Sequence, residues 1–253
     1  MQVTYSPNYK RVLDHGFVIL RNIAGPTRRP EQEFDAHDTD PANAARMSFN
    51  MTDVGVITLA DGSTRPRTED DDMKLSEYLI KNWHNTPFEM VEVWLEMKLP
   101  IFVARQFVRH RTAGINEVSG RYVTLPAEWY IPETVGGKAA NKKQGQEDNL
   151  GEEEQAQFKH FLSLHCQEGY DMYLSAIERG VAPEHARLFL SLNHYTHWLY
   201  KMDLHNLFNF MRLRDHSHAQ IEAQLYAQAV VELLDRVMPR SMALYRKYRK
   251  EQA

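Results

Sequence analysis

Cysteine is almost absent from this chain, with a single residue, Cys166, among 253. One cysteine excludes an intramolecular disulfide and a zinc cluster built from cysteines. Cys166 lies in a helical-looking stretch, F-L-S-L-H-C-Q-E-G-Y, where we expect a small buried apolar residue. The beginning of the chain lacks an apolar stretch of signal-peptide length, and no hydrophobic run is long enough to span a membrane. We therefore expect a cytoplasmic location and no membrane partner.

Several common motifs are missing as well. Without G-x-G-x-x-G or a P-loop, a nucleotide or flavin would not be held in the Rossmann or Walker manner. The G-x-S-x-G elbow of many hydrolases is absent, and so is the zinc motif H-E-x-x-H. The run D-H-S-H at 215–218, with Glu222 one turn beyond, matches no established zinc spacing. We expect no bound metal, and hydrogen bonding or capping as the role of these histidines.

An excess of positive charge is also lacking, because 30 Lys and Arg residues face 34 Asp and Glu residues and the net charge is −4. General nucleic-acid binders are usually basic, so we expect no nucleic-acid partner. A local basic pocket remains compatible with this balance.

Hydrophobic periodicity predicts an α+β fold, with a mixed or antiparallel sheet packed against several long helices in one domain over 1–253. Alternating apolar residues make 90–99 the clearest strand, and strands are also expected over 13–23 and 195–204. Helices are predicted over 41–49, 73–83, 101–109, 152–179, 205–214 and 219–238, and from Pro183 and Pro239 onward. Residues 50–70 are interpreted as a loop or small hairpin, and Pro87 is expected to prevent the helix predicted over 73–83 from continuing at Thr86.

The segment 133–154 has almost no apolar residues, so it cannot bury enough surface to offset the entropy of ordering. We expect an exposed polar loop there, rather than a linker between domains.

Candidate chemistry is concentrated in residues 106–122, which read Q-F-V-R-H-R-T-A-G-I-N-E-V-S-G-R-Y. A short helix is expected to lead into a polar loop there, and its arginines suit an anion because a guanidinium binds phosphate with two parallel hydrogen bonds. Arg187 and Arg214 lie in apolar helical segments, where an arginine must reach water or find an anion. Helix-end charge balance, a nucleic-acid contact and solvent-reaching side chains are the alternatives.

The spacing R-H-R, seven residues, then S-G-R-Y resembles the signature of the flavin-dependent thymidylate synthases. Further blocks resemble that family in the family's order: A-A-R-M-S-F at 44–49, H-N-T-P-F-E at 84–89, P-I-F-V-A-R-Q at 100–106, E-H-A-R ending at Arg187, and N-F-M-R-L-R-D-H-S-H-A-Q at 209–220. These blocks extend over nearly the whole chain.

The resemblance implies methylation of dUMP to dTMP, with 5,10-methylenetetrahydrofolate as carbon donor and NADPH-reduced FAD as hydride donor. It implies no protein nucleophile and a homotetramer with active sites shared between subunits. There are two alternatives. One is a nucleotide- or nucleic-acid-binding module without catalysis, and the other is a relative that binds nucleotide but has lost turnover.

Carried over residue by residue, the resemblance makes Arg214 the principal catalytic residue. The residues implied for dUMP are Gln106, Arg109, Glu117, Val118, Ser119, Gly120, Arg121, Arg187 and Arg214. Those implied for FAD are Ser48, Thr86, Glu89, Arg109, His110, Arg111, Glu117, Asp203, His205 and Asn209, with His84 near the folate.

Three positions depart from the family pattern. Gly114 stands where a serine is common, and Asp203 and His205 stand where Asn and Arg are expected. Loss of the arginine is expected to weaken FAD binding by ~1 to 3 kcal/mol. Protonation of His205 is expected to compensate for part of this loss.

Overall fold

The computed structural model describes residues 6–27, 31, 33–49, 55–138 and 146–250. Its centre is a five-stranded sheet in the order β1-β2-β5-β9-β6, in which every neighbouring pair is antiparallel. The strands are β1 (Tyr9–Val12), β2 (Gly16–Ala24), β5 (Glu92–Pro100), β6 (Gly114–Glu117) and β9 (Tyr195–Asp203). The predicted α+β class with an antiparallel sheet is confirmed.

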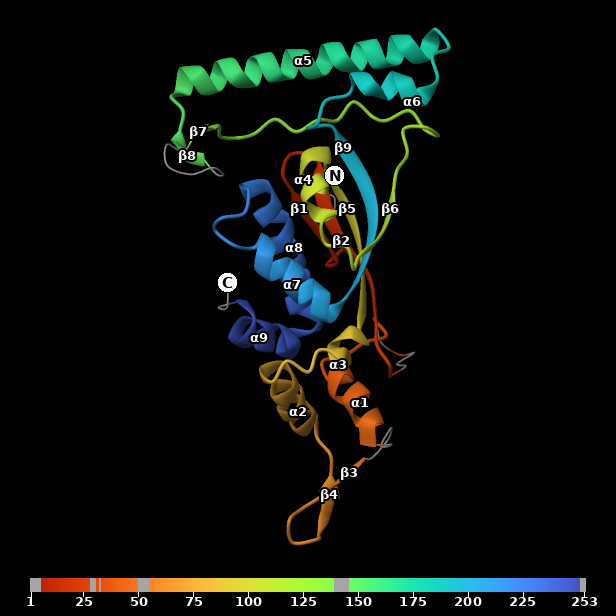
Figure 1. The fold of residues 1–253 in the computed structure, drawn as a ribbon, viewed down its shortest axis with the longest axis vertical. Coiled ribbons are helices and arrows are strands. Elements are labelled where there is room, and N and C mark those ends of the chain that lie inside the picture. Colours follow the sequence, from red (N-terminus) through yellow and green to blue (C-terminus); the bar gives the residue numbers. More distant parts are fainter. Residues whose placement is uncertain (1–5, 28–30, 32, 50–54, 139–145, 251–253) are drawn as a thin grey trace.

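One face of the sheet carries the main core. Along β5 the side chains of Val93, Leu95, Met97 and Leu99 are buried, while the residues between them are only partly buried. This alternation is the period-two pattern that the sequence predicted. The buried face packs against α4 (Ile101–Phe107), α7 (Leu204–Arg214) and α8 (Ile221–Val237), which lie together on one side of the sheet (Figure 1).

Smaller elements extend the molecule beyond one end of the sheet, at the bottom of Figure 1. They are α1 (Asp40–Arg46) with a 3-10 turn at Met47–Phe49, the hairpin β3 (Val56–Thr58) and β4 (Thr64–Pro66), α2 (Glu69–Lys81), α3 (Thr86–Glu89) and α9 (Pro239–Tyr248). The helices predicted at 41–49 and 73–83 and the possible hairpin within 50–70 are present. As predicted, α2 does not continue to Thr86, since it ends at Lys81, but a separate short helix that the sequence did not predict begins at Thr86. Proline occupies the second position of α3, where its missing N–H would have no partner within the helix.

Two segments predicted as polar loops contain strands. Residues 114–117 form β6, an edge strand that pairs with β9 and whose side chains are all exposed. Within 133–154, β7 (Gly136–Lys138) pairs with β8 (Gln146–Asn149), while 139–145 lies outside the described residues. Backbone pairing creates these strands, and none of their side chains whose burial the structure describes is buried, so no hydrophobic alternation marks them.

The predicted long helix is present as α5 (Glu152–Glu178), and Gly180, at φ +81°, ends it in the left-handed conformation. It lies across one end of the molecule, beside α6 (Pro183–Ala186) (Figure 1). Tyr173, Ala176 and Ala186 form a small separate core there. Apolar side chains nearer the start of α5, such as Phe161, are exposed, so its apolar face is only partly covered.

No helix among the described residues combines the length and the apolar character needed to cross a bilayer.

Candidate functional site

The predicted site residues form three groups along the molecule (Figure 1). The α4–α7 group lies where those two helices end and consists of Gln106, Arg109, His110, Arg111 and Arg214. The β6–α6 group consists of Glu117, Val118, Ser119, Gly120, Arg121 and Arg187. The α3–α7 group consists of Ser48, His84, Thr86, Glu89, Asp203, His205 and Asn209.

Arg214 is held from two sides in the α4–α7 group. Its Nε donates to Nε2 of His110 at 3.0 Å, and its Nη2 donates to the carbonyl oxygen of Gln106 at 3.0 Å. The side-chain amide of Gln106 in turn donates to Oε1 of Gln220 at 2.6 Å. Burial lowers the pKa of Arg214, which reflects a partly desolvated guanidinium. Among the described residues Arg214 has no carboxylate partner, so its charge remains available to a ligand.

His110 is a neutral acceptor in this arrangement. Burial and, to a smaller extent, the positive charge of Arg214 together lower the pKa of His110 to about 4. Because Nε2 accepts the hydrogen bond from Arg214, the neutral ring carries its proton on Nδ1. The ring also packs edge-on against Phe210, with centroids 5.0 Å apart. His110 therefore orients Arg214 and adds no third positive charge to the R-H-R run.

Arg109 and Arg111 are exposed on either side of His110. Neither forms an ion pair within the part of the chain that the structure describes. Together with Arg214 they place three guanidinium groups, none neutralised by a described carboxylate, near the ends of α4 and α7. Such a concentration of positive charge favours an anionic ligand.

The β6–α6 group brings Arg187 against the S-G-R-Y run. Gly120 is buried, and a Cβ added there would lie 3.1 Å from Leu125 Cδ1 and 3.6 Å from Arg187 Cδ. This close approach explains why a residue without a side chain is needed at 120. Arg121 pairs with Glu184 through Nε and Oε2 at 3.3 Å, with both side chains about half exposed. Arg187 thus lies beside Gly120, the neighbour of Arg121 in the chain, whereas α6 and α7 lie apart in Figure 1 and no hydrogen bond or ion pair between described residues joins this group to Arg214.

Two further members of the β6–α6 group are engaged by β9. Oε1 of Glu117 accepts from the hydroxyl of Thr196 at 2.5 Å, and the backbone N–H of Val118 donates to the carbonyl of His197 at 2.9 Å. Pairing with β9 therefore sets where the S-G-R-Y run begins.

Helix α7 connects the α3–α7 group to Arg214. His205 and Asn209 are four residues apart and so share one face of the helix. Arg214 follows Asn209 by five residues, which is ~7.5 Å along the helix axis. At ~3.6 residues per turn, these five residues also rotate the side-chain direction by ~140°, so Arg214 does not share the face of His205 and Asn209.

The departures from the family pattern at Asp203 and His205 have different structural consequences. Asp203 caps α7, because its carboxylate accepts from the N–H of Asn206 at 2.9 Å. Burial lowers the pKa of His205, against the opposing charges of Asp203 and Glu89. Protonation of His205 is therefore disfavoured. This argues against the expectation that a charged His205 compensates for part of the weaker FAD binding.

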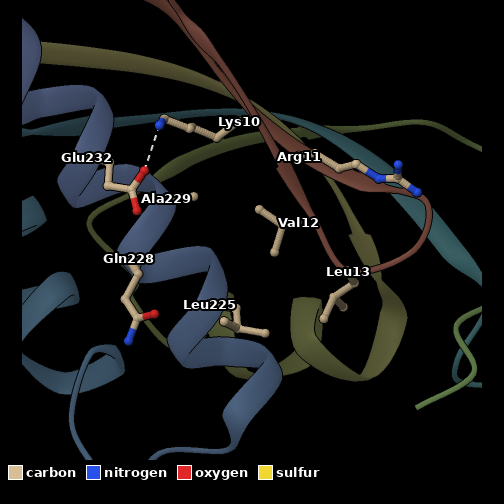
Figure 2. Close-up of a pocket in the computed structure, with 8 residues that line it drawn as sticks. All are labelled: Lys10, Arg11, Val12, Leu13, Leu225, Gln228, Ala229 and Glu232. Atoms are coloured by element: carbon tan, nitrogen blue, oxygen red, sulfur yellow. Dashed lines mark ion pairs between the residues drawn. The ribbon is translucent and has the colours of Figure 1, made fainter. Parts of the chain in front are cut away.

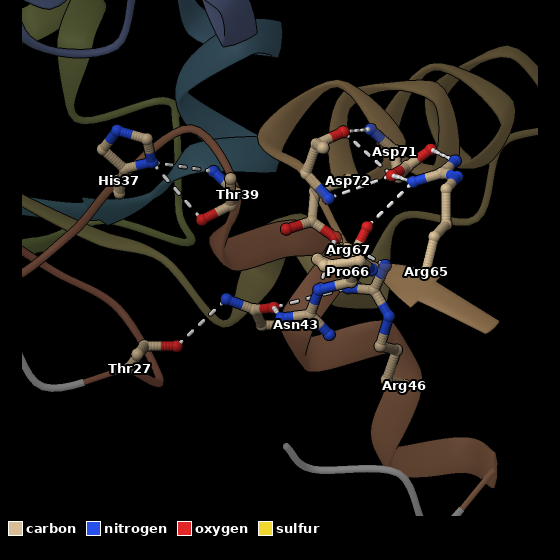
Figure 3. A network of polar contacts seen from close by, with 11 residues as sticks. Thr27, His37, Thr39, Asn43, Arg46, Arg65, Pro66, Arg67, Asp71 and Asp72 are labelled. Atoms are coloured by element: carbon tan, nitrogen blue, oxygen red, sulfur yellow. Dashed lines mark hydrogen bonds and ion pairs between the residues drawn. The ribbon is translucent and has the colours of Figure 1, made fainter. Parts of the chain in front are cut away.

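A polar network secures α1, which leads to the exposed Ser48 (Figure 3). Nη2 of Arg46 lies 2.5 Å from Oδ1 of Asp72 on α2, and Nε of Arg67 lies 3.4 Å from the same oxygen. Two hydrogen bonds of 2.7 Å join Arg65 to Asp71, and they hold the pKa of Asp71 well below its ordinary value. The roles of these arginines could not be predicted from the sequence, because their partners lie on other elements.

The remaining polar features lie elsewhere. A hollow between β1 and α8 is lined by Lys10, Arg11, Val12, Leu13, Leu225, Gln228, Ala229 and Glu232 (Figure 2), and it includes none of the predicted site residues. His216 and His218 stack with ring centroids 5.0 Å apart, and the N–H of His218 donates to Nδ1 of His216 at 3.2 Å. Within the described residues no three His, Cys, Asp or Glu side chains form a metal-binding group. Cys166 is buried, as predicted.

The family model described as "Thymidylate synthase complementing protein" matches residues 32–240. A flavin-dependent thymidylate synthase of Ruegeria pomeroyi is 39% identical over 244 residues, covering 94% of this chain and 73% of the relative. A flavin-dependent thymidylate synthase of Thermus thermophilus is 39% identical over 237 residues, covering 94% and 78%.

The crystal structure of a UMP/dUMP methylase, PolB from Streptomyces cacaoi, bound with 5-Br dUMP, is similar in fold. Its TM-score is 0.76 at 21% identity, with 95% of this chain and 99% of that chain covered. The match to the family model and the extent of the sequence identity lead to one conclusion: this chain belongs to the flavin-dependent thymidylate synthase family.

Proposed function

We propose that this chain methylates dUMP to dTMP and that the site centres on Arg214. FAD, reduced by NADPH, supplies the hydride when bound, and 5,10-methylenetetrahydrofolate supplies the carbon. The observation that carries the proposal is the guanidinium of Arg214, held by His110 and by the Gln106 carbonyl and left without a described carboxylate. We treat 1–253 as one domain, and we expect a cytoplasmic location.

Arg214 would face the uracil ring of the nucleotide. A fixed positive charge there stabilises the negative charge that develops on the ring when its carbon five attacks. An arginine keeps this charge throughout the working pH range. The hydrogen bonds from His110 and Gln106 fix the direction of the guanidinium, so little reorganisation is needed during the reaction. Cys166, buried beside Ser191 and Asn193, is not required as a nucleophile.

The nucleotide-binding residues are proposed to come from two of the three groups. Besides Arg214, they are Gln106, Arg109, Glu117, Val118, Ser119, Gly120, Arg121 and Arg187. Arg121 and Arg187 suit the phosphate, because its two negative charges need more than one cationic donor. The backbone N–H groups next to Ser119 can complete the anion site.

The FAD-binding residues are proposed to lie near both ends of α7, together with Glu117 from β6. They are Ser48, Thr86, Glu89, Arg109, His110, Arg111, Glu117, Asp203, His205 and Asn209, with His84 next to the folate. The donor set fits this cofactor, since hydroxyl, amide and imidazole groups can bond the heteroatoms of a flavin and two exposed guanidinium groups can bond a diphosphate. The Asp203 carboxylate, which caps α7, has lone pairs left to accept from a further donor.

A complete site is proposed to need more than one chain, as in a homotetramer. Within one chain Arg121 and Arg187 lie apart from Arg214, so subunit association would have to bring them together. Large exposed apolar side chains support such association: Phe161 on α5 is 59% exposed, and Leu188 and Leu192, which follow α6, are 77% and 69% exposed. Contiguous apolar side chains on a surface are typical of protein–protein interfaces.

The test of catalysis compares Arg214→Ala with Arg246→Ala, which removes an exposed arginine from α9. Tritium release from dUMP labelled at carbon five, FAD absorbance and bleaching by NADPH are measured for both. We expect Arg214→Ala to retain bleaching and to lose turnover by at least about 100-fold, the effect of removing a group that stabilises developing charge. Near-normal turnover of Arg214→Ala would remove it from this role. A wild-type protein without tritium release would be a relative that has lost turnover.

The test of shared sites mixes two inactive variants, Arg187→Ala and Arg214→Ala, through unfolding and reassociation. If one subunit supplies Arg187 and another supplies Arg214, random mixing restores roughly one intact site in four. Mixtures as inactive as the separate variants would show that both residues act within one chain.

A further inference from the structure

Arg249, just beyond the end of α9, is buried although it is an arginine, with a relative exposure of 6%. Its Cζ lies 3.7 Å from the ring centroid of Trp83, and its Nη2 donates to Oδ1 of Asn85 at 3.5 Å. Its Nη1 donates to the carbonyl of Tyr248 at 3.3 Å. Among the described residues no carboxylate pairs with it. The ring face of Trp83 is thus the main group that compensates for desolvation of the guanidinium.

Trp83 has an unusual backbone conformation. Its φ is +61°, in the left-handed region that favours glycine, and its N–H donates to the carbonyl of Ile80 at 3.3 Å as α2 ends. A bulky residue in this region is strained and persists when its surroundings hold it in place. The stacked guanidinium and the bond to Asn85 provide such surroundings, because they attach this segment to α9.

The strained residue belongs to a segment with two proposed ligand contacts. Residues 82–86, here the α2–α3 turn, include His84 and Thr86, which the proposed function assigns to the folate and to FAD. The ring of Tyr78 packs edge-on against His84, with centroids 5.9 Å apart. Residues of α9 also hold α2, the helix before the turn. Nζ of Lys247 and the hydroxyl of Tyr248 both donate to Oε1 of Glu77 on α2, at 2.6 and 2.7 Å. The α2–α3 turn is therefore held from α9, an element more than 150 residues away in the sequence.

Arg249 also affects His205, one of the residues proposed to bind FAD. Its positive charge is one of the influences that lower the pKa of His205, although burial is the largest. Arg249 therefore lies near enough to α7 to connect the α2–α3 turn with the proposed FAD residues.

We propose that Arg249 is a positioning residue: by stacking on Trp83 and bonding Asn85, it holds the α2–α3 turn in the shape that presents His84 and Thr86 to the folate and FAD. This inference rests on the proposed function. It assigns a role to the C-terminal segment, which supplies none of the residues named for the ligands.

Three variants of the full chain test the inference. Arg249→Met removes the charge but keeps an unbranched side chain of similar reach, and Arg249→Lys keeps a cation that can lie over the indole ring. Trp83→Gly removes the stack while suiting the left-handed backbone, so it is expected to fold. Arg246→Met, on the exposed side of α9, is the matched control.

The measurements separate positioning from general stability. They are the FAD dissociation constant of flavin-free protein, the KM values for methylenetetrahydrofolate and dUMP, and amide hydrogen exchange of residues 82–86 without ligands. For Arg249→Met and Trp83→Gly we expect roughly tenfold weaker FAD binding and a roughly tenfold higher folate KM, with the dUMP KM within about twofold. Exchange in the α2–α3 turn is expected to accelerate roughly tenfold. Arg249→Lys is expected to recover most of these losses, and Arg246→Met to match the wild type.

The inference is overturned if Arg249→Met leaves the FAD constant, the folate KM and the exchange rate of the turn within about twofold of wild type. It is overturned equally if the dUMP KM rises as much as the folate KM, because that pattern indicates general destabilisation. Hydrogen exchange needs no turnover, so it tests the contact between Arg249 and the α2–α3 turn independently of catalytic activity. A wild-type protein that neither binds FAD nor methylates dUMP would refute the proposed function whatever the exchange of the turn.

Discussion

Replacement of His110 by glutamine tests whether this residue is a neutral acceptor for Arg214. The side-chain oxygen of glutamine can take the place of Nε2 and accept from Nε of Arg214, but it does not titrate. The wild type and His110→Gln are therefore expected to differ in how their stability depends on pH. At pH 7 both accept the hydrogen bond, and their free energies of unfolding are expected to be similar.

The sign and size of the pH effect follow from the pKa of His110. In the unfolded chain a histidine begins to bind its proton near pH 6.5, whereas in the folded chain His110 stays neutral until about pH 4. Between these values the unfolded state binds more protons, so acidification destabilises the wild type. Full conversion of this difference gives about 3 kcal/mol. His110 is only partly buried, so solvent screening reduces the expected loss to ~1 to 2 kcal/mol between pH 7 and pH 4.5.

The assay is urea unfolding of flavin-free protein at several pH values, followed by circular dichroism at one fixed protein concentration. Fixed concentration matters because subunit association would contribute to the measured stability. The wild type is expected to lose ~1 to 2 kcal/mol more than His110→Gln between pH 7 and pH 4.5. Equal pH dependence in the two proteins would refute a neutral, desolvated His110. In Arg214→Ala the pKa of His110 is expected to rise but to stay below 6.5, because burial is the larger cause.

Two further predictions concern stability, measured by urea unfolding at pH 7. Arg46→Ala leaves Asp72 buried with one weaker partner, so we expect a loss of ~2 to 3 kcal/mol. Arg65→Ala removes a partner from a more exposed pair and is expected to cost clearly less. Equal losses would contradict a special role for the buried pair. Gly180→Ala forces a Cβ into a left-handed conformation and is expected to cost ~1 kcal/mol, whereas Gly55→Ala, in open space, is expected to be nearly neutral. Gly180→Ala with unchanged stability would contradict the strain argument.

Periodicity predicted the elements that bury one continuous face. The strand β5 alternates buried and partly buried side chains, as its sequence does, and α7 and α8 carry apolar residues at helical spacing. Family membership could also be predicted, because the residues that resemble the family lie in short contiguous blocks such as R-H-R and S-G-R-Y. These features are local, so the order of residues alone reveals them.

Elements without a buried face could not be predicted in this way. The strand β6 exposes all its side chains and exists because its backbone pairs with β9. For α5, the apolar stripe predicted a packed helix, but tertiary structure covers only part of it, near Tyr173 and Ala176. Periodicity reports that a face is apolar and does not report what covers it.

The sequence by itself determined the fold class, the main helices, the absence of a disulfide and the family. Only the tertiary structure decided that Arg214 bonds Gln106 across 108 residues, that a neutral His110 orients it, and that Arg249 stacks on Trp83. It also decided that Arg187 meets Gly120 apart from Arg214 within one chain. The physical reason is that hydrogen bonds, stacking and desolvation depend on distances between atoms, and those distances are set when the whole chain packs around the sheet.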